Sequence, residues 1–158
     1  MRSEQEAIRA VNMYADTVKR ICLIYLKNST DTEDVFQTVF LKYITKDTEF
    51  ENEENEKAWF IRVSINACKD FMKNSFRSKR TAFDDLNLIG EEMTLKDTDT
   101  LNAVLSLPLK YKQVIYLHYY EGYTANEISK IISKKPNTVY TLITRAKNML
   151  KEKLKGEI

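Results

Sequence analysis

The first third of the chain contains two stretches in which apolar side chains recur every three or four residues. This spacing places them on one face of a helix. The first stretch spans 4–28, and its predicted inward positions are Ile8, Val11, Ala15, Val18, Cys22 and Tyr25. Thr30 and Glu33 have the spacing of a capping box, which predicts a second helix over 31–45. The inward positions of that helix are Val35, Phe36, Val39, Phe40 and Tyr43.

An acidic, asparagine-rich segment without periodicity, 49–57, predicts a loop. A third helix is predicted over 57–77, with basic side chains outward and with Phe60, Val63, Ala67 and Phe71 inward. Trp59 is expected at the side of this helix, either packed at the edge of the core or stacked on an unpaired base. Helices of this length need tertiary partners, so the three are predicted to form one bundle.

The periodicity fails over residues 78–99, which mix charges with few apolar side chains and predict a linker. A second helical block follows the linker. Its first helix, over 101–107, is predicted to stop near Pro108. The next helix is predicted to end at Gly122, since glycine commonly takes the left-handed position after a helix.

Residues 124–150 predict two helices joined by a tight turn at 133–135. Thr124 and Glu127 form a capping box for the first, and Pro136 suits the first turn of the second. The second helix is predicted to bury Val139, Ile143, Ala146 and Leu150 and to expose Asn137, Tyr140, Thr141, Thr144, Arg145 and Asn148. This pattern is typical of a helix-turn-helix with a recognition helix, and an ordinary helical hairpin is the alternative.

Composition and charge narrow the class of protein. Three glycines and two prolines in 158 residues are too few for all-β folds or glycine-rich phosphate loops, so the predicted fold class is all-α. The net charge of +2 combines segments of +2 (1–30), −7 (31–56), +6 (57–80), −5 (81–100) and +6 (101–158). The two basic segments are two places for a nucleic acid to bind, the alternative being helices merely coated with Lys and Arg.

The candidate chemistry does not indicate an enzyme. Glu33 and Asp34 are adjacent acids at a helix start, His118 stands in an aromatic helix, and no nucleotide-binding or hydrolase motif occurs. Cys22 and Cys68 fit neither a disulfide framework nor a metal motif and are expected to be buried thiols. With no signal sequence and no membrane-length apolar run, we expect a cytoplasmic protein without catalytic residues, metal or cofactor.

Two parts of the chain resemble a known family. Residues 107–154 share with it Leu107–Pro108, Tyr111, Val114, Tyr119, Glu121–Gly122, Glu127–Ile128, Thr138–Val139 and Arg145–Ala146–Lys147. These residues resemble region 4 of sigma-70 family RNA polymerase sigma factors, of the extracytoplasmic-function (ECF) type. DTEDVFQTVFLKY (31–43) resembles the segment of region 2 that binds the polymerase clamp helices. KAWFIRVSINACKDFMK (57–73) resembles the segment that melts the promoter and reads its −10 element.

The resemblance implies two small helical domains joined by an acidic linker. Region 2 would span 1–80, the linker 81–99, and region 4, which reads the −35 element, 100–158. The implied function is that of a bacterial alternative sigma factor, which binds core RNA polymerase and directs promoter-specific transcription initiation. The alternatives are a stand-alone helix-turn-helix repressor and a helical adaptor that does not bind DNA.

The resemblance also implies the site residues. The polymerase-binding residues would be Asp34, Gln37 and Phe40. Those for the −10 element would be Asn52, Asn55, Trp59, Asn66, Lys69 and Lys73, and the loop 50–57 would capture a flipped base unless it is only a solvated connector. Those for the −35 element would be Asn137, Thr138, Tyr140, Thr141, Thr144, Arg145 and Lys147.

Four positions depart from the family pattern. Ser133 stands where the family often has glycine, Lys134 where it has an apolar residue, and Tyr140 and Leu142 where it commonly has Lys or Arg. Leu142 is expected at the edge of the DNA-facing side. The implied partners are core RNA polymerase, through its clamp helices and flap, and promoter DNA, with an anti-sigma factor as a further candidate. The protein is expected to be a monomer when free, with no membrane insertion.

Overall fold

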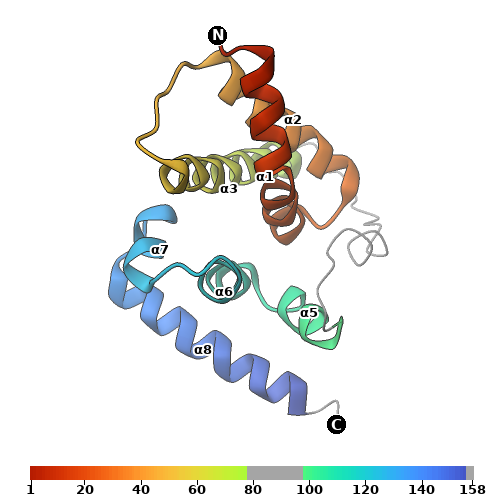
Figure 1. Cartoon of the computed structure of the whole chain (residues 1–158). Coiled ribbons are helices and arrows are strands. Elements are labelled where there is room, and N and C mark those ends of the chain that lie inside the picture. Colours follow the sequence, from red (N-terminus) through yellow and green to blue (C-terminus); the bar gives the residue numbers. More distant parts are fainter. Residues whose placement is uncertain (78–97, 156–158) are drawn as a thin grey trace. The chain divides into compact units, whose positions relative to one another are not determined.

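The computed structural model describes residues 1–77 and 98–155, and every regular element in these two ranges is a helix (Figure 1). The chain divides into two compact units, Met1–Met93 and Thr94–Ile158. The segment predicted as a linker lies outside the described residues, apart from its last two positions. Those two positions belong to the first helix of the second unit.

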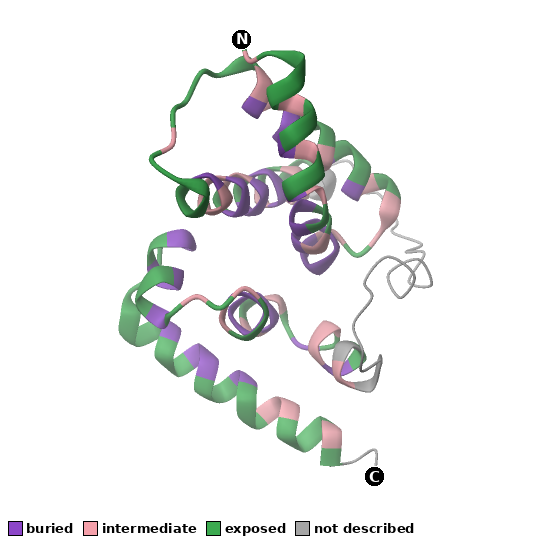
Figure 2. Cartoon of the chain, in the orientation of Figure 1, coloured by how far each residue is buried: buried purple, intermediate pink, exposed green. Residues whose placement is uncertain are grey.

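Unit 1 is a three-helix bundle of α1 (Glu4–Leu26), α2 (Ser29–Thr45) and α3 (Glu53–Arg77), each packed against the other two. Its centre is the fully buried ring of Phe60. The ring centroids of Tyr14, Tyr43 and Phe40 lie 4.7, 4.9 and 5.1 Å from that of Phe60. Aromatic pairs at these separations contribute to stability beyond the area that they bury. Figure 2 shows the buried residues on the sides of the helices that face one another.

Two details of the first two helices differ from the sequence predictions. Ile8 is 53% exposed, whereas Ala10, Tyr14 and Thr17 are buried, so the inward face of α1 is rotated from the predicted one. The helix α2 begins at Ser29 because Asn28 caps it, its side-chain oxygen accepting from the Asp31 amide at 2.8 Å. The predicted capping box of Thr30 and Glu33 is therefore wrong.

The helix α3 begins four residues earlier than predicted, inside the acidic segment. Asn52 accepts a hydrogen bond from the Asn55 amide at 2.8 Å, which is the contact of an N-cap residue. The buried side of α3 is also broader than the predicted stripe. Val63 and Phe71 are only half-buried, and the side chains buried in addition to Phe60 and Ala67 are Glu56, Ile61, Ser64, Ile65 and Cys68.

Unit 2 contains α5 (Thr98–Leu105), α6 (Leu109–Ile115), the π-helical turn η1 (Tyr116–Tyr120), α7 (Ala125–Ile131) and α8 (Pro136–Lys155). The long helix α8 packs against α5, α6 and α7. Gly122 has φ 81° and ends the α6–η1 segment, as predicted. Lys112 is only 1% exposed, so it does not contribute to the basic surface of this unit.

Candidate nucleic-acid and polymerase interfaces

Six side chains line one face of α3. Asn55, Arg62, Asn66 and Lys73 are exposed, and Trp59 and Lys69 are half-buried. Their spacings alternate between four and three residues, which keeps them on one side of the helix. We call these six residues the α3 stripe. It combines an aromatic ring, amides and cations, and so brings together all the predicted −10 residues except Asn52.

A pocket of about 810 Å³ lies in unit 1, beside the start of α3. Its walls come from Arg2 just before α1, α1 itself, the end of α2, the loop 46–52 and the first turn of α3. Asn52 lines this pocket, but its side-chain oxygen already caps α3, so its NH2 group is the part left for a ligand. The charged residues of the lining are Arg2, Arg9, Glu6, Asp47, Glu49, Glu53 and Glu56.

The buried carboxylate of Glu56 is the shared acceptor at the centre of a hydrogen-bond network in this part of unit 1. The Arg9 guanidinium donates to both of its oxygens, at 3.0 and 2.8 Å. The hydroxyls of Tyr14 and Tyr43 each donate at 2.8 Å. Burial raises the pKa of Glu56, but the hydrogen bonds from Tyr43, Arg9 and Tyr14 outweigh it and hold the pKa below its usual value. Glu56 is therefore an anion at neutral pH and cannot itself act as a proton donor to a ligand.

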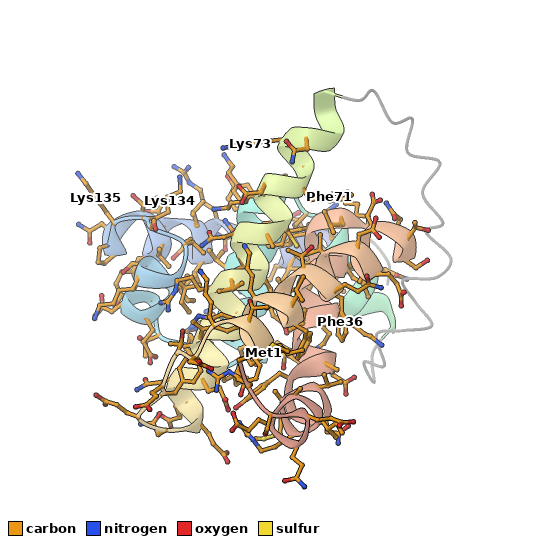
Figure 3. All side chains as sticks on the ribbon, turned by 90° about the horizontal axis from the view of Figure 1, so that it is seen from above. Met1, Phe36, Phe71, Lys73, Lys134 and Lys135 are labelled. Carbon is orange, nitrogen blue, oxygen red and sulfur yellow. The ribbon has the colours of Figure 1, made fainter. Side chains whose placement is uncertain are left out.

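The helix-turn-helix of unit 2 is built by local contacts. The Thr124 hydroxyl accepts from the Glu127 amide at 3.2 Å, and the Glu127 carboxylate accepts from the Thr124 amide at 2.9 Å, which confirms the predicted capping box. Ser133 has φ 57°, so the turn uses the left-handed conformation that glycine adopts more easily. Pro136 is the first residue of α8, as predicted. Lys134 and Lys135 project from the turn between α7 and α8 (Figure 3).

All seven predicted −35 residues on α8 are exposed. They are Asn137, Thr138, Tyr140, Thr141, Thr144, Arg145 and Lys147. The Lys147 ammonium lies 5.6 Å from the centroid of the Tyr119 ring, which fixes its direction. Leu142 is buried together with Val139, Ile143 and Ala146. The expectation that Leu142 lies at the edge of the DNA-facing side is therefore wrong, because the helix turns this position into the core.

The exposed face of α2 carries Asp34, Gln37 and Leu41, spaced by three and four residues. Leu41 is 61% exposed, whereas Phe40 is only 5% exposed and packs against Phe36 and Phe60. Phe40 is therefore a core residue, and its assignment to the polymerase-binding surface is wrong. Leu41 is the apolar residue that this surface presents, and we call Asp34, Gln37 and Leu41 the α2 face.

Sequence reasoning missed three residues of these sites. Leu41 had a readable signal, because it stands in register with Asp34 and Gln37 on a helix. Arg2 and Glu56 had none, since each acquires its partners from segments more than ten residues away.

Within residues 1–77 and 98–155, no group of three or more His, Cys, Asp or Glu side chains is placed to hold a metal ion. None of the helices described in these ranges is long and apolar enough to cross a membrane.

Comparison with known families assigns both units. Residues 10–79 match the model of sigma-70 region 2, and residues 99–150 match that of sigma-70 region 4. The chain belongs to the sigma-70 family of RNA polymerase sigma factors. It is a sigma factor of the ECF type, which directs transcription initiation.

Individual relatives agree with this assignment. The chain is 29% identical over 140 residues to the RNA polymerase sigma factor SigV of Bacillus subtilis (strain 168), covering 87% of this chain and 84% of that protein. It is 24% identical over 175 residues to the ECF sigma factor SigW of the same organism, covering 98% and 92% of the two chains.

Solved structures share the fold. The sigma factor RpoE in complex with the anti-sigma factor NepR from Bartonella quintana matches with a TM-score of 0.73 at 18% identity, covering 96% of this chain and 98% of that one. CnrH in complex with the cytosolic domain of CnrY matches with a TM-score of 0.67 at 18% identity, covering 99% and 92%.

Proposed function

We propose that the chain divides the work of a sigma factor between its two units. In unit 1, the α2 face docks on core polymerase, and the α3 stripe holds the unpaired strand of the −10 element. In unit 2, the exposed face of α8 reads the −35 duplex. The protein performs no catalysis of its own, acts in the cytoplasm, and is a monomer when free. An anti-sigma factor is a further proposed partner.

The observation that carries this proposal is the α3 stripe together with the pocket near its start. A strand held without base pairing needs cations for its phosphates and ring faces for its bases, and stacking contributes about 1–3 kcal/mol per base. Lys69 and Lys73 supply the cations, and Trp59 supplies the ring. Trp59 also packs near Phe50 and Tyr43, with centroids 6.0 and 5.8 Å away, so its edge is fixed by the core.

The pocket suits the edge of a base better than a phosphate. Its lining holds five carboxylates and only two guanidiniums, and this excess of negative charge repels a phosphate. Carboxylate oxygens accept hydrogen bonds from exocyclic amines, so a flipped adenine, cytosine or guanine is favoured as the occupant over thymine, which has no such amine. Extruding a base costs a few kcal/mol, which contacts of this kind would offset.

The start of α8 supplies the −35 contacts. The Asn137 amide can pair with adenine through two hydrogen bonds, which discriminates against other bases by about 1–3 kcal/mol. The Thr141 hydroxyl donates to the Asn137 carbonyl at 3.0 Å, so its methyl group and lone pairs remain for DNA. Arg145, Lys134 and Lys135 are exposed and would bind the backbone, which sets the register of the helix.

Transcription in vitro with a heterologous bacterial core enzyme on pooled genomic fragments tests the function as a whole. The expected result is initiation at a restricted set of promoters, and no initiation above core alone would contradict the proposal. Selection of randomised −35 duplexes by wild type, Asn137→Ala and Thr141→Ala tests the readout. A changed preference at one or two positions supports direct readout, and a uniform loss would show that these residues only position the helix. A repressor would instead elute as a dimer and fail to join the core enzyme.

A further inference from the structure

Arg2 connects the end of α2 to the loop 46–52. Its Nε donates to the Tyr43 carbonyl at 2.8 Å, and a terminal nitrogen donates to the Thr48 carbonyl. Its guanidinium carbon lies 4.1 Å from the centroid of the Tyr43 ring and 5.7 Å from that of Phe50. Its backbone amide donates to the Ile44 carbonyl at 2.9 Å.

Through these contacts the Arg2 guanidinium holds the end of α2 and the loop 46–52 together. The carbonyls of Tyr43 and Ile44 belong to the last turn of α2, where the helix itself supplies no donors. Thr48 lies in the middle of the loop, and Arg2 also lines the pocket that this loop encloses. Only a planar fork of several N–H groups can reach both carbonyls while stacking on a ring, so a lysine would not replace it.

The rest of the loop has two further anchors. Phe50 packs on Trp59 with ring centroids 6.0 Å apart, and Asn52 caps α3. Between the end of α2 and Phe50, the loop has two contacts: the Arg2 bond to Thr48, and an ion pair of the Met1 ammonium with Asp47 at 2.9 Å whose partners are 78% and 71% exposed. An ion pair this exposed contributes little, so Arg2 is the main anchor of this part of the loop. Without Arg2, Thr48 and Glu49, which both line the pocket, lose a fixed position.

We infer that Arg2 is a positioning residue for promoter opening: by holding the loop 46–52 it sets the shape of the base pocket and thereby the selectivity for one base of the −10 element. This inference rests on the proposed function, because it takes the pocket as the site of a flipped base. Arg2 is only 12% exposed at its side chain, so it acts through the loop rather than by binding the backbone of DNA. Core binding and −35 binding would not depend on it.

The test uses the full chain with core enzyme and a promoter pool randomised across the −10 element. Base frequencies in open complexes are compared for wild type, Arg2→Ala, Arg2→Lys and the control Arg20→Ala. Arg20 lies in α1, away from the loop 46–52, and contacts Thr17 locally. In Arg2→Ala, the frequency of the most preferred base relative to that of the least preferred base should fall about tenfold at one position. The frequencies at the other positions and the affinity for core enzyme should stay as in the control. Arg2→Lys should show the same change, smaller in size.

Hydrogen exchange provides a second readout that does not involve DNA. Amides of 46–52 should exchange faster in Arg2→Ala, while those in the middle of α1 and α3 keep their protection. Unchanged base ratios, a uniform loss of open complexes, or unchanged exchange in 46–52 would each overturn the inference. If Arg2→Ala does not fold, wild-type base ratios in Arg2→Lys overturn it. Absence of open complexes with wild type would instead reject the proposed function, and the inference with it.

Discussion

Glu56 and Arg9, which are 47 residues apart in the chain, form an ion pair in which an arginine nitrogen lies 2.8 Å from a carboxylate oxygen. The Glu56 side chain is 7% exposed and that of Arg9 is 44% exposed. The carboxylate is thus the desolvated partner, and it depends on hydrogen bonds from the arginine and from two tyrosines. A glutamine at this position keeps one acceptor oxygen and has an NH2 group in place of the other, so one tyrosine hydroxyl loses its acceptor and the Arg9 guanidinium loses one of its two, which is costly in a buried site.

Glu56→Gln should therefore lower the free energy of unfolding by about 2 kcal/mol at pH 7. The pKa of Glu56 is lower in the folded protein than in the unfolded chain, so the unfolded chain binds more protons and stability falls as the pH decreases. The difference between wild type and variant should therefore shrink below about pH 4.3, the usual pKa of glutamate. Urea unfolding at pH 7 and pH 3 measures both values.

The matched control for that experiment is Glu54→Gln, an exposed glutamate in the same turn of α3. Its effect should stay within about 0.5 kcal/mol. A loss in Glu56→Gln that is equal at both pH values would show that packing, and not charge, is responsible.

Ser133→Gly should stabilise unit 2. Ser133 has φ 57°, a conformation that costs a residue with a Cβ about 1–2 kcal/mol, and the added chain entropy of glycine offsets part of the gain. The expected net gain is about 0.5–1 kcal/mol, measured as a higher Tm of the unit 2 transition. Lys134→Gly, at the next position, should be destabilising.

Gly122→Ala tests the same backbone argument, and here the expected effect is a loss of stability. Gly122 has φ 81°, and an added Cβ would meet no atom within 4 Å, so the cost comes from the backbone alone. A loss of about 1 kcal/mol is expected. Stabilisation by this change would contradict the account of both turns.

The features that the sequence predicted correctly are determined by neighbouring residues. The capping box of Thr124 and Glu127, the first-turn Pro136 and the left-handed Gly122 each depend on a few consecutive positions. The outward face of α8 followed from its buried stripe in the same way. Such features can be read before the fold is known, because the physical cause lies within one turn of the chain.

The errors arose where the cause is tertiary. An acidic segment predicts a loop, yet Glu56 is buried because Arg9, Tyr14 and Tyr43 come to it from two other helices. For Phe40, apolar spacing was right, because it placed this ring on the inward face of its helix, and the error came from the resemblance, which assigned Phe40 to the polymerase-binding surface. The core position of Phe40 is set by its contact with Phe60 on α3.

Cys22 and Cys68 should not react with an aromatic disulfide reagent in the folded protein. Both thiols are buried, and the hydrogen bond to Cys22 together with burial raises the pKa of the Cys68 thiol well above its usual range. The thiolate is the reactive species, so little of it is present at pH 8. Titration should give no fast reaction in buffer and two equivalents in urea, and one fast equivalent in buffer would contradict the buried arrangement.

Asp34→Arg combined with Gln37→Ala should weaken binding to core polymerase and leave the Tm nearly unchanged, because both side chains are exposed. Leu41→Lys should do the same. Phe40→Ala is the contrasting variant, and should destabilise unit 1 by about 3–5 kcal/mol because it empties a core position. Core affinity measured at a temperature where all variants are folded separates the two effects. Unchanged core affinity in the variant that combines Asp34→Arg, Gln37→Ala and Leu41→Lys would reject this interface.

Lys73→Ala should reduce open-complex formation at all promoters alike. Lys73 is exposed near the end of the α3 stripe, beyond Asn66 and Lys69, and Figure 3 shows it projecting from α3. A lysine that neutralises one phosphate releases condensed counterions, so its removal should lower the slope of log affinity against log salt by about one. Lys27→Ala, which removes an exposed lysine at the end of α1, is the control and should leave the slope unchanged. A promoter-selective loss in Lys73→Ala would place this side chain at a base instead of the backbone.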